Sequence, residues 1–242
     1  TWPNYMVVGL FLILGNIIND LYDVEIDKIN KPNRLLAQRT INHYYIWTLW
    51  TIILCIAIYF TLLLNHTALY LSILILLLII LYTPFFKGLP ILGNIIISFL
   101  VGAVFIFVEL ALINEIQIMH IPFFLAFGLT LIREFNKDIE DIEGDQELHL
   151  KTFPAIYKEE ASSAVLTILI MIFVFFSYIP FFINYTLYGY EYLLSISLFM
   201  NIPLMLVIKN LHSSNKFLRK NSKLLKIANI TGILIIYIAL NW

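Results

Sequence analysis

Charged residues are scarce in this sequence, and their scarcity excludes a soluble globular domain. Asp, Glu, Lys and Arg make up 13% of the 242 residues, whereas 61% of the residues are hydrophobic. A soluble domain covers its surface with about 25% charged residues. We therefore expect an integral membrane protein.

Cysteine and paired histidines are lacking as well. The single cysteine, Cys55, cannot form a disulfide bond within the chain. The five histidines stand apart from one another, and none has the spacing of a metal-ligand pair with another. We therefore expect no zinc or copper site, and we expect no nucleic-acid partner.

Long apolar runs are what the sequence has in abundance. A helix needs about 20 residues to cross a bilayer. Eight runs approach or exceed this length, at residues 4–22, 42–64, 68–82, 91–113, 120–137, 161–182, 188–208 and 225–241. The sequence predicts an all-α polytopic membrane protein with eight transmembrane helices in a single domain over residues 1–242.

The basic residues define an orientation for these helices. If the helices alternate in direction, all 15 Lys and Arg residues fall on one side, in residues 23–41, 83–90, 133–160 and 209–224 with their flanking helix ends. Positive charge marks the cytoplasmic side. We therefore expect a multi-pass protein of the cell membrane with both chain ends outside. A cytoplasmic N-terminus would require one more helix before Thr1.

Acidic residues gather at the end of the first apolar run. In GNIINDLYDVEIDKINKPNR, residues 15–34, four positions fall within about 60° of one another on a helix. They are Asn16, Asp20, Asp23 and Asp27, with Asn19 at the edge of the same stripe.

The same spacing returns 118 residues later. In REFNKDIEDIEGD, residues 133–145, the stripe consists of Glu134, Asp138, Asp141 and Asp145, and Lys137 takes the place of Asn19. Two matching stripes indicate a duplicated site in a pseudo-duplicated helical bundle.

A divalent metal would offset the charge of these stripes. Carboxylates at a helix C-terminus repel one another and the helix dipole, and residues 16–27 contain no Lys or Arg. Oxygen ligands alone favour Mg²⁺, which binds best where a phosphate completes its shell. The alternative is that both clusters are solvated loop acids.

Basic residues near the stripes suit an anion. Lys31 and Arg34 follow the first stripe, Lys137 lies within the second, and Lys87 stands alone in YTPFFKGLPILGN, residues 82–94. A guanidinium and several ammonium groups could hold a diphosphate. The alternative for Lys31 and Arg34 is that they only set the orientation.

These motifs resemble those of the UbiA superfamily of intramembrane prenyltransferases. The first aspartate signature reads here as Asn19, Asp20, Asp23 and Asp27, followed by NKPNR. The second reads as Asp138, Asp141 and Asp145, with Gly144 and with Lys151, Thr152, Phe153 and Pro154 after it. The element between them reads as Tyr82, Lys87, Gly93 and Asn94. The resemblance covers nearly the whole chain.

The resemblance implies a fold and a chemistry. Family members have nine transmembrane helices, so this chain corresponds to helices two to nine, without the first. The implied reaction moves a polyprenyl group from its diphosphate, with two Mg²⁺ ions and a site that opens to the cytoplasmic side. The two stripes look most like the archaeal branch that makes digeranylgeranylglyceryl phosphate, an ether-lipid precursor. The implied partners are a prenyl diphosphate such as geranylgeranyl diphosphate, a lipid-phosphate acceptor and membrane lipid.

The resemblance also implies roles for individual residues. One metal ion is expected on Asn19, Asp23 and Asp27 and the other on Asp141 and Asp145, with Asp20 and Asp138 as further ligands. Asp23, Asp27, Asp141, Asp145 and Lys87 are the expected catalytic residues. Substrate contacts are expected from Lys31, Arg34, Tyr82, Asn94 and Lys137.

Two other readings remain open. An aromatic or quinone-precursor prenyltransferase, with an acceptor like 4-hydroxybenzoate, would keep the same site and change only the acceptor. A transporter or channel would also use internal duplication and acidic residues, but its charges should lie near the middle of the bilayer. Here the charges crowd the helix ends on one side.

Overall fold

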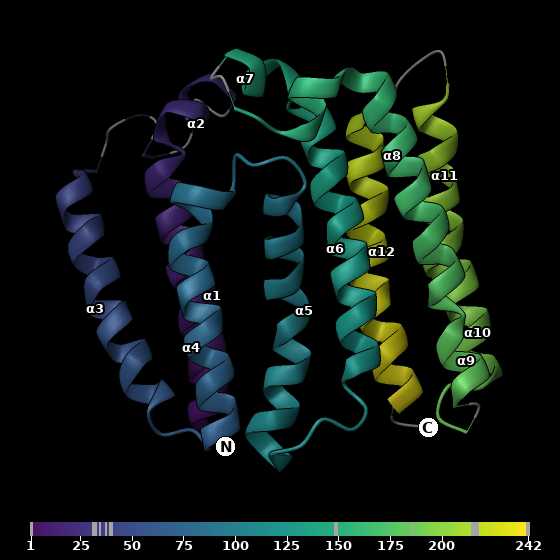
Figure 1. Ribbon diagram of the computed structural model, residues 1–242, viewed down its shortest axis with the longest axis horizontal. Helices are drawn as coiled ribbons and strands as arrows, with labels where there is room; N and C mark the ends of the chain where they lie inside the picture. The colour runs from purple at the N-terminus through teal and green to yellow at the C-terminus, as the bar shows by residue number, and fades with distance from the viewer. Residues whose placement is uncertain are drawn as a thin grey trace.

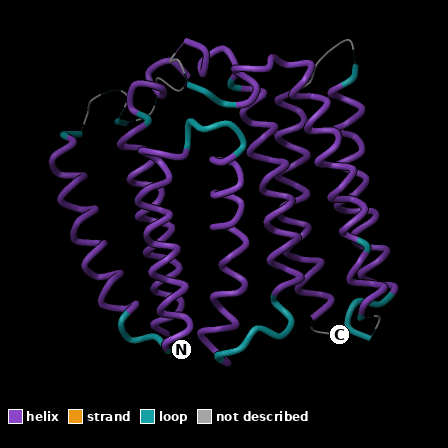
Figure 2. Tube along the Cα trace, in the orientation of Figure 1, coloured by secondary structure: helices purple, strands orange, loops and turns teal. Residues whose placement is uncertain are grey.

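The computed structural model describes residues 2–30, 33, 35, 36, 38, 41–147, 150–184, 186–213 and 218–240. All regular structure in these residues is helical (Figures 1 and 2). The first half of the chain forms α1 (Trp2–Tyr22), α2 (Val24–Asn30), α3 (His43–Thr61), α4 (His66–Leu81), the π-helix η1 (Tyr82–Phe86) and α5 (Leu92–Ile113). The second half forms α6 (His120–Glu140), α7 (Ile142–Glu147), α8 (Phe153–Ser177), α9 (Ile179–Ile183), α10 (Tyr190–Ile196), the π-helix η2 (Ser197–Asn201), α11 (Ile202–Leu211) and α12 (Leu218–Leu240).

Each of the eight predicted spans corresponds to a long helix or to a run of joined helices, so the predicted fold class is confirmed. Seven of them in the described part are long and apolar enough to cross a membrane. The eighth, α6, has 21 residues, but five charged side chains fall in its last eight positions, residues 133–140. The charged end of α6 therefore does not face lipid, and only its first part is apolar.

Two predicted boundaries were wrong. Helix α8 begins at Phe153 rather than at 161, and α12 begins at Leu218 rather than at 225. In both cases polar residues extend the helix beyond its apolar run, where hydropathy gives no signal. Within α8, Lys158 has φ 65°, which breaks the helix between its polar start and its apolar body.

Asparagine and glutamate side chains fix the connections at the lower end in Figure 1. The Asn65 carboxamide oxygen accepts from the Ala68 N–H at 2.9 Å and so caps α4, while its NH₂ group donates to the Leu110 carbonyl of α5 at 2.8 Å. The buried Glu109 carboxylate accepts the N–H of Ile118 at 2.8 Å, just before α6. These contacts hold α4, α5 and α6 in register.

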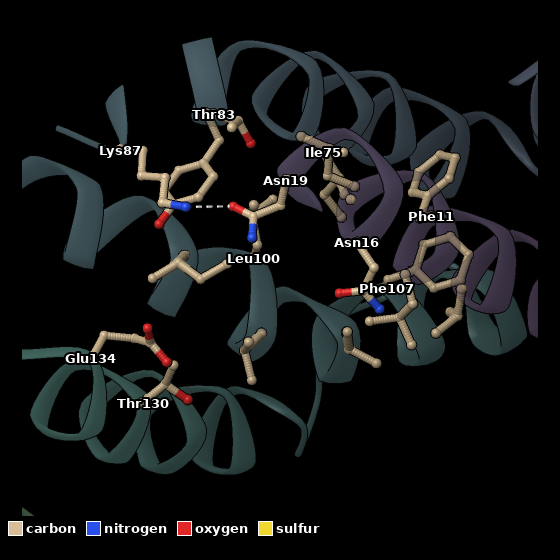
Figure 3. Close-up of a pocket in the computed structure, with 18 of the residues that line it drawn as sticks. Phe11, Asn16, Asn19, Ile75, Thr83, Lys87, Leu100, Phe107, Thr130 and Glu134 are labelled. Atoms are coloured by element: carbon tan, nitrogen blue, oxygen red, sulfur yellow. Dashed lines mark hydrogen bonds between the residues drawn. The ribbon is translucent and has the colours of Figure 1, made fainter. Parts of the chain in front are cut away.

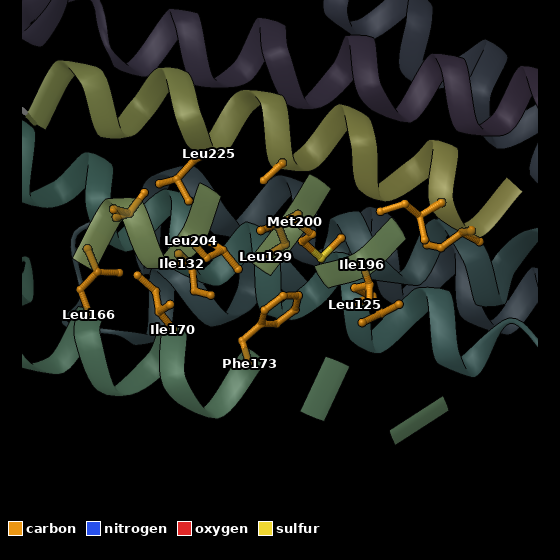
Figure 4. Close-up of a cluster of buried hydrophobic side chains, with 14 of the residues drawn as sticks. Leu125, Leu129, Ile132, Leu166, Ile170, Phe173, Ile196, Met200, Leu204 and Leu225 are labelled. Atoms are coloured by element: carbon orange, nitrogen blue, oxygen red, sulfur yellow. The ribbon is translucent and has the colours of Figure 1, made fainter. Parts of the chain in front are cut away.

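Each half of the chain has its own hydrophobic core. In the first half the buried apolar residues come from α1, α3, α4 and α5. In the second they come from α6, α8, α10, η2, α11 and α12, and Figure 4 shows Leu129, Ile170, Met200 and Leu204 meeting there. The halves join where α5 packs along α6. Many large apolar side chains face outward, as expected for a surface covered by lipid.

The same helix break occurs in both halves, 118 residues apart. Helix α1 ends at Tyr22 and α2 begins at Val24, while α6 ends at Glu140 and α7 begins at Ile142. The residues between are Asp23 and Asp141. The Asp23 N–H donates to the Asn19 carbonyl at 2.9 Å, and the Asp141 N–H donates to the Lys137 carbonyl at 3.0 Å. The predicted duplication is therefore visible in the local backbone.

Candidate active site

The first stripe is held by Lys87. Its ammonium group forms an ion pair with the Asp23 carboxylate and donates to the Asn19 carboxamide oxygen at 2.8 Å. The Asn19 NH₂ group in turn donates to the Asp23 Oδ2 atom at 2.9 Å, so the three side chains contact one another. Asp23 is buried and the Lys87 side chain is 25% exposed, so the ion pair is partly shielded from solvent and stronger than a surface pair.

The chain reaches this position through an unusual turn after α4. Residues Tyr82–Phe86 form a π-helix that contains Pro84, and the Lys87 N–H donates to the Tyr82 carbonyl at 2.8 Å. The chain then returns so closely that a Cβ atom on Gly93 would lie 2.9 Å from the Phe86 carbonyl oxygen. Gly93 therefore permits the close approach that places Lys87 beside α1.

The rest of the first stripe lies partly beside this pair. Asp27 is buried at 5% exposure within α2, and its N–H donates to the Asp23 carbonyl at 2.7 Å. Asp20 is half-buried. Glu25, in contrast, is exposed and pairs with Lys28, so it lies off the stripe. Lys31 and Arg34 lie outside the described residues.

The second stripe is held by neutral donors. Asn94, buried in the first turn of α5, donates to Asp138 at 2.8 Å, and the Thr152 hydroxyl donates to Asp145 at 2.8 Å. Asp141 is half-buried between them along the stripe. The sequence motif includes Thr152 but assigns it no role, whereas its hydrogen bond shows that it orients the Asp145 carboxylate.

The environment of Asp145 favours a cation. Burial raises the pKa of this carboxyl, and the nearby Asp141 carboxylate raises it further. The Thr152 hydrogen bond and the more distant Lys137 and Lys87 act in the opposite direction without cancelling the rise. A cation near Asp145 would therefore stabilise its charged form.

The two stripes come together at one end of the bundle. Helices α2 and α7, which continue the stripes, lie against each other at the upper end in Figure 1. We call this the acidic end. Since α1 and α6 both finish there, the predicted duplicated site is a single place in the fold.

A cavity of about 400 Å³ runs from this end into the bundle. Figure 3 shows its polar end, with Lys87, Asn19, Thr83 and Glu134, and its apolar end, with Phe11 and Phe107. The Thr83 hydroxyl is buried in the cavity wall and has no hydrogen-bond partner among the described residues.

Only part of the predicted site lines this cavity. Asn19, Tyr82, Lys87 and Lys137 do, whereas the aspartates and Asn94 stand behind them at the acidic end. Sequence reasoning missed Arg133, Thr83 and Thr130, which also line the cavity. A signal for Arg133 existed, because it is the first charge after a long apolar run and precedes the second stripe by one residue.

The donor set, which consists of oxygen ligands, fits a hard cation in its chemistry. Among the described residues, no three His, Cys, Asp or Glu side chains converge as a complete metal cage. Mg²⁺ does not need one, because it usually takes one or two carboxylates and completes its shell with water and substrate phosphate. Buried Asp23, Asp27 and Asp145 offer such carboxylates.

Fold and site together define a polytopic membrane protein with a largely apolar cavity whose polar end adjoins the two aspartate stripes. The sequence profile of the UbiA prenyltransferase family matches residues 5–230, and the chain belongs to this family. Digeranylgeranylglyceryl phosphate synthase of Natronomonas pharaonis is 32% identical over 179 residues, which cover 74% of this chain. The chain spans 64% of that relative's length in the match.

Solved structures agree with this assignment. A structure from work on digeranylgeranylglyceryl phosphate synthase in membranes is 29% identical, has a TM-score of 0.72, and covers 99% of this chain and 83% of its own. A UbiA homolog from Archaeoglobus fulgidus, bound to GPP and Mg²⁺, is 17% identical with a TM-score of 0.66, and the match covers 97% of this chain and 87% of that one. The second likeness shows the fold.

Proposed function

We propose that this protein transfers a geranylgeranyl group from its diphosphate to the hydroxyl of geranylgeranylglyceryl phosphate, in archaeal ether-lipid synthesis. The observation that carries the proposal is the convergence of two aspartate stripes at the polar mouth of a deep apolar cavity. The names of the relatives support the choice of acceptor, and the homolog bound to GPP and Mg²⁺ supports a prenyl diphosphate donor.

The cavity sorts the parts of such a donor by polarity. Its diphosphate lies at the acidic end, where the Lys87 ammonium group can donate to it. Its tail lies among the apolar side chains toward Phe11 and Phe107, where burial in the bundle excludes water.

Two Mg²⁺ ions, one on each stripe, would neutralise the departing diphosphate when bound. Asn19, Asp20, Asp23 and Asp27 would hold one ion, and Asp138, Asp141 and Asp145 the other. Asn94 and Thr152 each hydrogen-bond one carboxylate of the second stripe, at Asp138 and Asp145, and would fix its orientation for an ion bound there.

The reaction balances without a further reactant. The allylic carbon–oxygen bond of the donor breaks, and its electron pair leaves with the diphosphate. An ether bond forms between that carbon and the acceptor oxygen, and the hydroxyl proton is released. Because water would compete with the acceptor for the allylic cation, the dry apolar cavity decides the product. Lys87 stabilises the departing anion. The concentration of basic residues at this end supports a cytoplasmic orientation for it.

Replacement of one stripe carboxylate on each half tests the proposal. Asp23→Asn and Asp141→Asn keep side-chain size but remove the negative charge. With geranylgeranyl diphosphate, geranylgeranylglyceryl phosphate and Mg²⁺ in detergent, each variant should lose about a hundredfold or more in kcat. Mass spectrometry identifies the ether product, and a parallel reaction with 4-hydroxybenzoate tests the aromatic acceptor.

The controls are carboxylates on the same short helices that lie off the stripes. Glu25→Gln in α2 and Glu143→Gln in α7 remove one exposed charge each and should leave turnover within about twofold, since exposed charges interact weakly. Wild-type turnover in either aspartate variant would refute the metal roles. Transfer to 4-hydroxybenzoate alone would identify the aromatic enzyme.

A further inference from the structure

The two helices that carry the stripes also form facing walls of the cavity. Four of the seven α1 residues that line it have counterparts 118 positions later in α6, and those four α6 residues line it too. We call the matched α1 residues the α1 wall, which consists of Leu12, Gly15, Asn16 and Asn19, and the matched α6 residues the α6 wall, which consists of Thr130, Arg133, Glu134 and Lys137. The duplication therefore supplies two matched walls with different side chains.

The walls differ in charge. The α1 wall has no ionisable side chain, whereas the α6 wall has Arg133, Glu134 and Lys137. A charge is unfavourable in a membrane helix unless a partner or a function compensates it. Arg133 follows 13 positions, residues 120–132, that contain no Asp, Glu, Lys or Arg. Its position therefore calls for a ligand or a partner.

Among the described residues, the Arg133 guanidinium has one partner and keeps most of its N–H groups without a hydrogen bond. Its Nη1 atom pairs with the neighbouring Glu134 carboxylate, and its other N–H groups make no hydrogen bond to a described residue. The side chain is 39% exposed. Lys87, across the cavity, is by contrast held by both Asp23 and Asn19. Among the three basic side chains that line the cavity, Arg133 and Lys137 on the α6 wall therefore keep N–H donors without a partner among the described residues.

We propose that Arg133, with Lys137 one turn further along α6, binds the anionic phosphate head of the acceptor lipid and makes the enzyme prefer phosphorylated acceptors. This assignment rests on the proposed function. A guanidinium offers two parallel N–H groups to a phosphate, which an ammonium cannot do. The α1 wall and Lys87 are left for the donor, so each wall recognises one substrate.

The test compares two acceptors that differ only in the phosphate. Wild type and variants receive geranylgeranyl diphosphate and Mg²⁺ with either geranylgeranylglyceryl phosphate or geranylgeranylglycerol. For Arg133→Gln we expect kcat/KM with the phosphorylated acceptor to fall roughly ten- to hundredfold. We expect kcat/KM with geranylgeranylglycerol, and KM for the donor, to change by less than about threefold.

Three further variants separate binding from folding. Arg133→Lys keeps the charge and should recover part of the preference. Arg133→Gln combined with Glu134→Gln leaves no unpaired carboxylate, so it gives the acceptor ratio even if Arg133→Gln alone misfolds. Lys223→Gln removes an exposed basic residue outside the cavity and should leave the ratio unchanged.

The outcomes are distinct. A folded Arg133→Gln variant with the wild-type acceptor ratio overturns the assignment, as does an equal loss with both acceptors or a loss confined to donor KM. If the wild type transfers to neither lipid acceptor, the proposed function fails and the assignment fails with it.

Discussion

A single hydroxyl acts on the pKa of Asp145, a carboxyl in the short helix α7 outside the membrane spans. Thr152 donates to Asp145 at 2.8 Å and opposes the rise in pKa that burial and Asp141 produce. Because the hydrogen bond favours the charged form, its removal raises the pKa of Asp145 further. A protonated Asp145 cannot serve as a metal ligand.

Thr152→Val should therefore move the acidic limb of the pH–activity profile to higher pH, with little change on the alkaline side. Measurement of kcat/KM across the acidic range, at saturating Mg²⁺, gives the midpoint. Thr48→Val, which removes an exposed hydroxyl from α3, is the matched control and should not move it. A shift to lower pH would contradict the role given to Thr152.

Sequence patterns predicted the carboxylates but not their partners. The acidic residues of each stripe are spaced by 4, 3 and 4 positions, and this spacing puts them on one face of a helix whatever the helix packs against. The ion pair of Lys87 with Asp23 joins residues 64 positions apart, and the contact of Asn94 with Asp138 spans 44. Contacts of this kind depend on how α1, α5 and α6 pack, which apolar periodicity cannot predict in a membrane protein.

At the scale of elements, close helix contacts depend on small residues. A Cβ atom on Gly128 of α6 would lie 2.5 Å from the Phe173 ring of α8, which is itself buried. A Cβ atom on Gly9 of α1 would meet nothing within 4 Å. The two glycines are therefore a matched pair, one in a tight contact and one in open space.

Gly128→Ala should lower stability by about 1–3 kcal/mol, because the Phe173 ring must shift in a packed core. Gly9→Ala should raise it by about 0.5–1 kcal/mol, because alanine favours the helix. Thermal melting of both variants in the same detergent shows whether each Tm falls or rises relative to the wild type. A Gly128→Ala protein that melts at or above the wild-type Tm would show that α6 and α8 pack more loosely.

Hydropathy predicted the ends of the helices only where those ends coincide with the edges of the bilayer. The eight spans were predictable because each apolar run must be long enough to cross. The starts of α8 and α12 were not, because polar residues continue those helices beyond the lipid. The breaks at Asp23 and Asp141 were not either, since both stripes read as continuous helix.

At the scale of the whole molecule, the length of the cavity along the helices limits the length of the tail that it can hold. Val7 and Asn19 of α1 both line it and are 12 residues apart, 19 minus 7, which corresponds to about 18 Å at about 1.5 Å per residue. Val7 and Phe107 line its apolar end, and both are nearly inaccessible. A tail that enters from the acidic end has this depth available.

Val8→Trp should shorten the accepted donor, because the larger ring fills the deep end. We expect turnover with geranylgeranyl diphosphate to fall about tenfold or more relative to dimethylallyl diphosphate, as overpacking predicts. Ile13→Trp, on an exposed position of α1 that does not line the cavity, is the control. Equal losses for both donor lengths would show that Val8 does not set the depth.

The cavity runs along the helices rather than across them, with its polar mouth at one surface. On the proposed function, both substrates then keep their head groups at that surface throughout the reaction, and so does the product. New lipid is accordingly delivered to one leaflet only. Growth of the opposite leaflet requires a separate step that turns the finished molecule over.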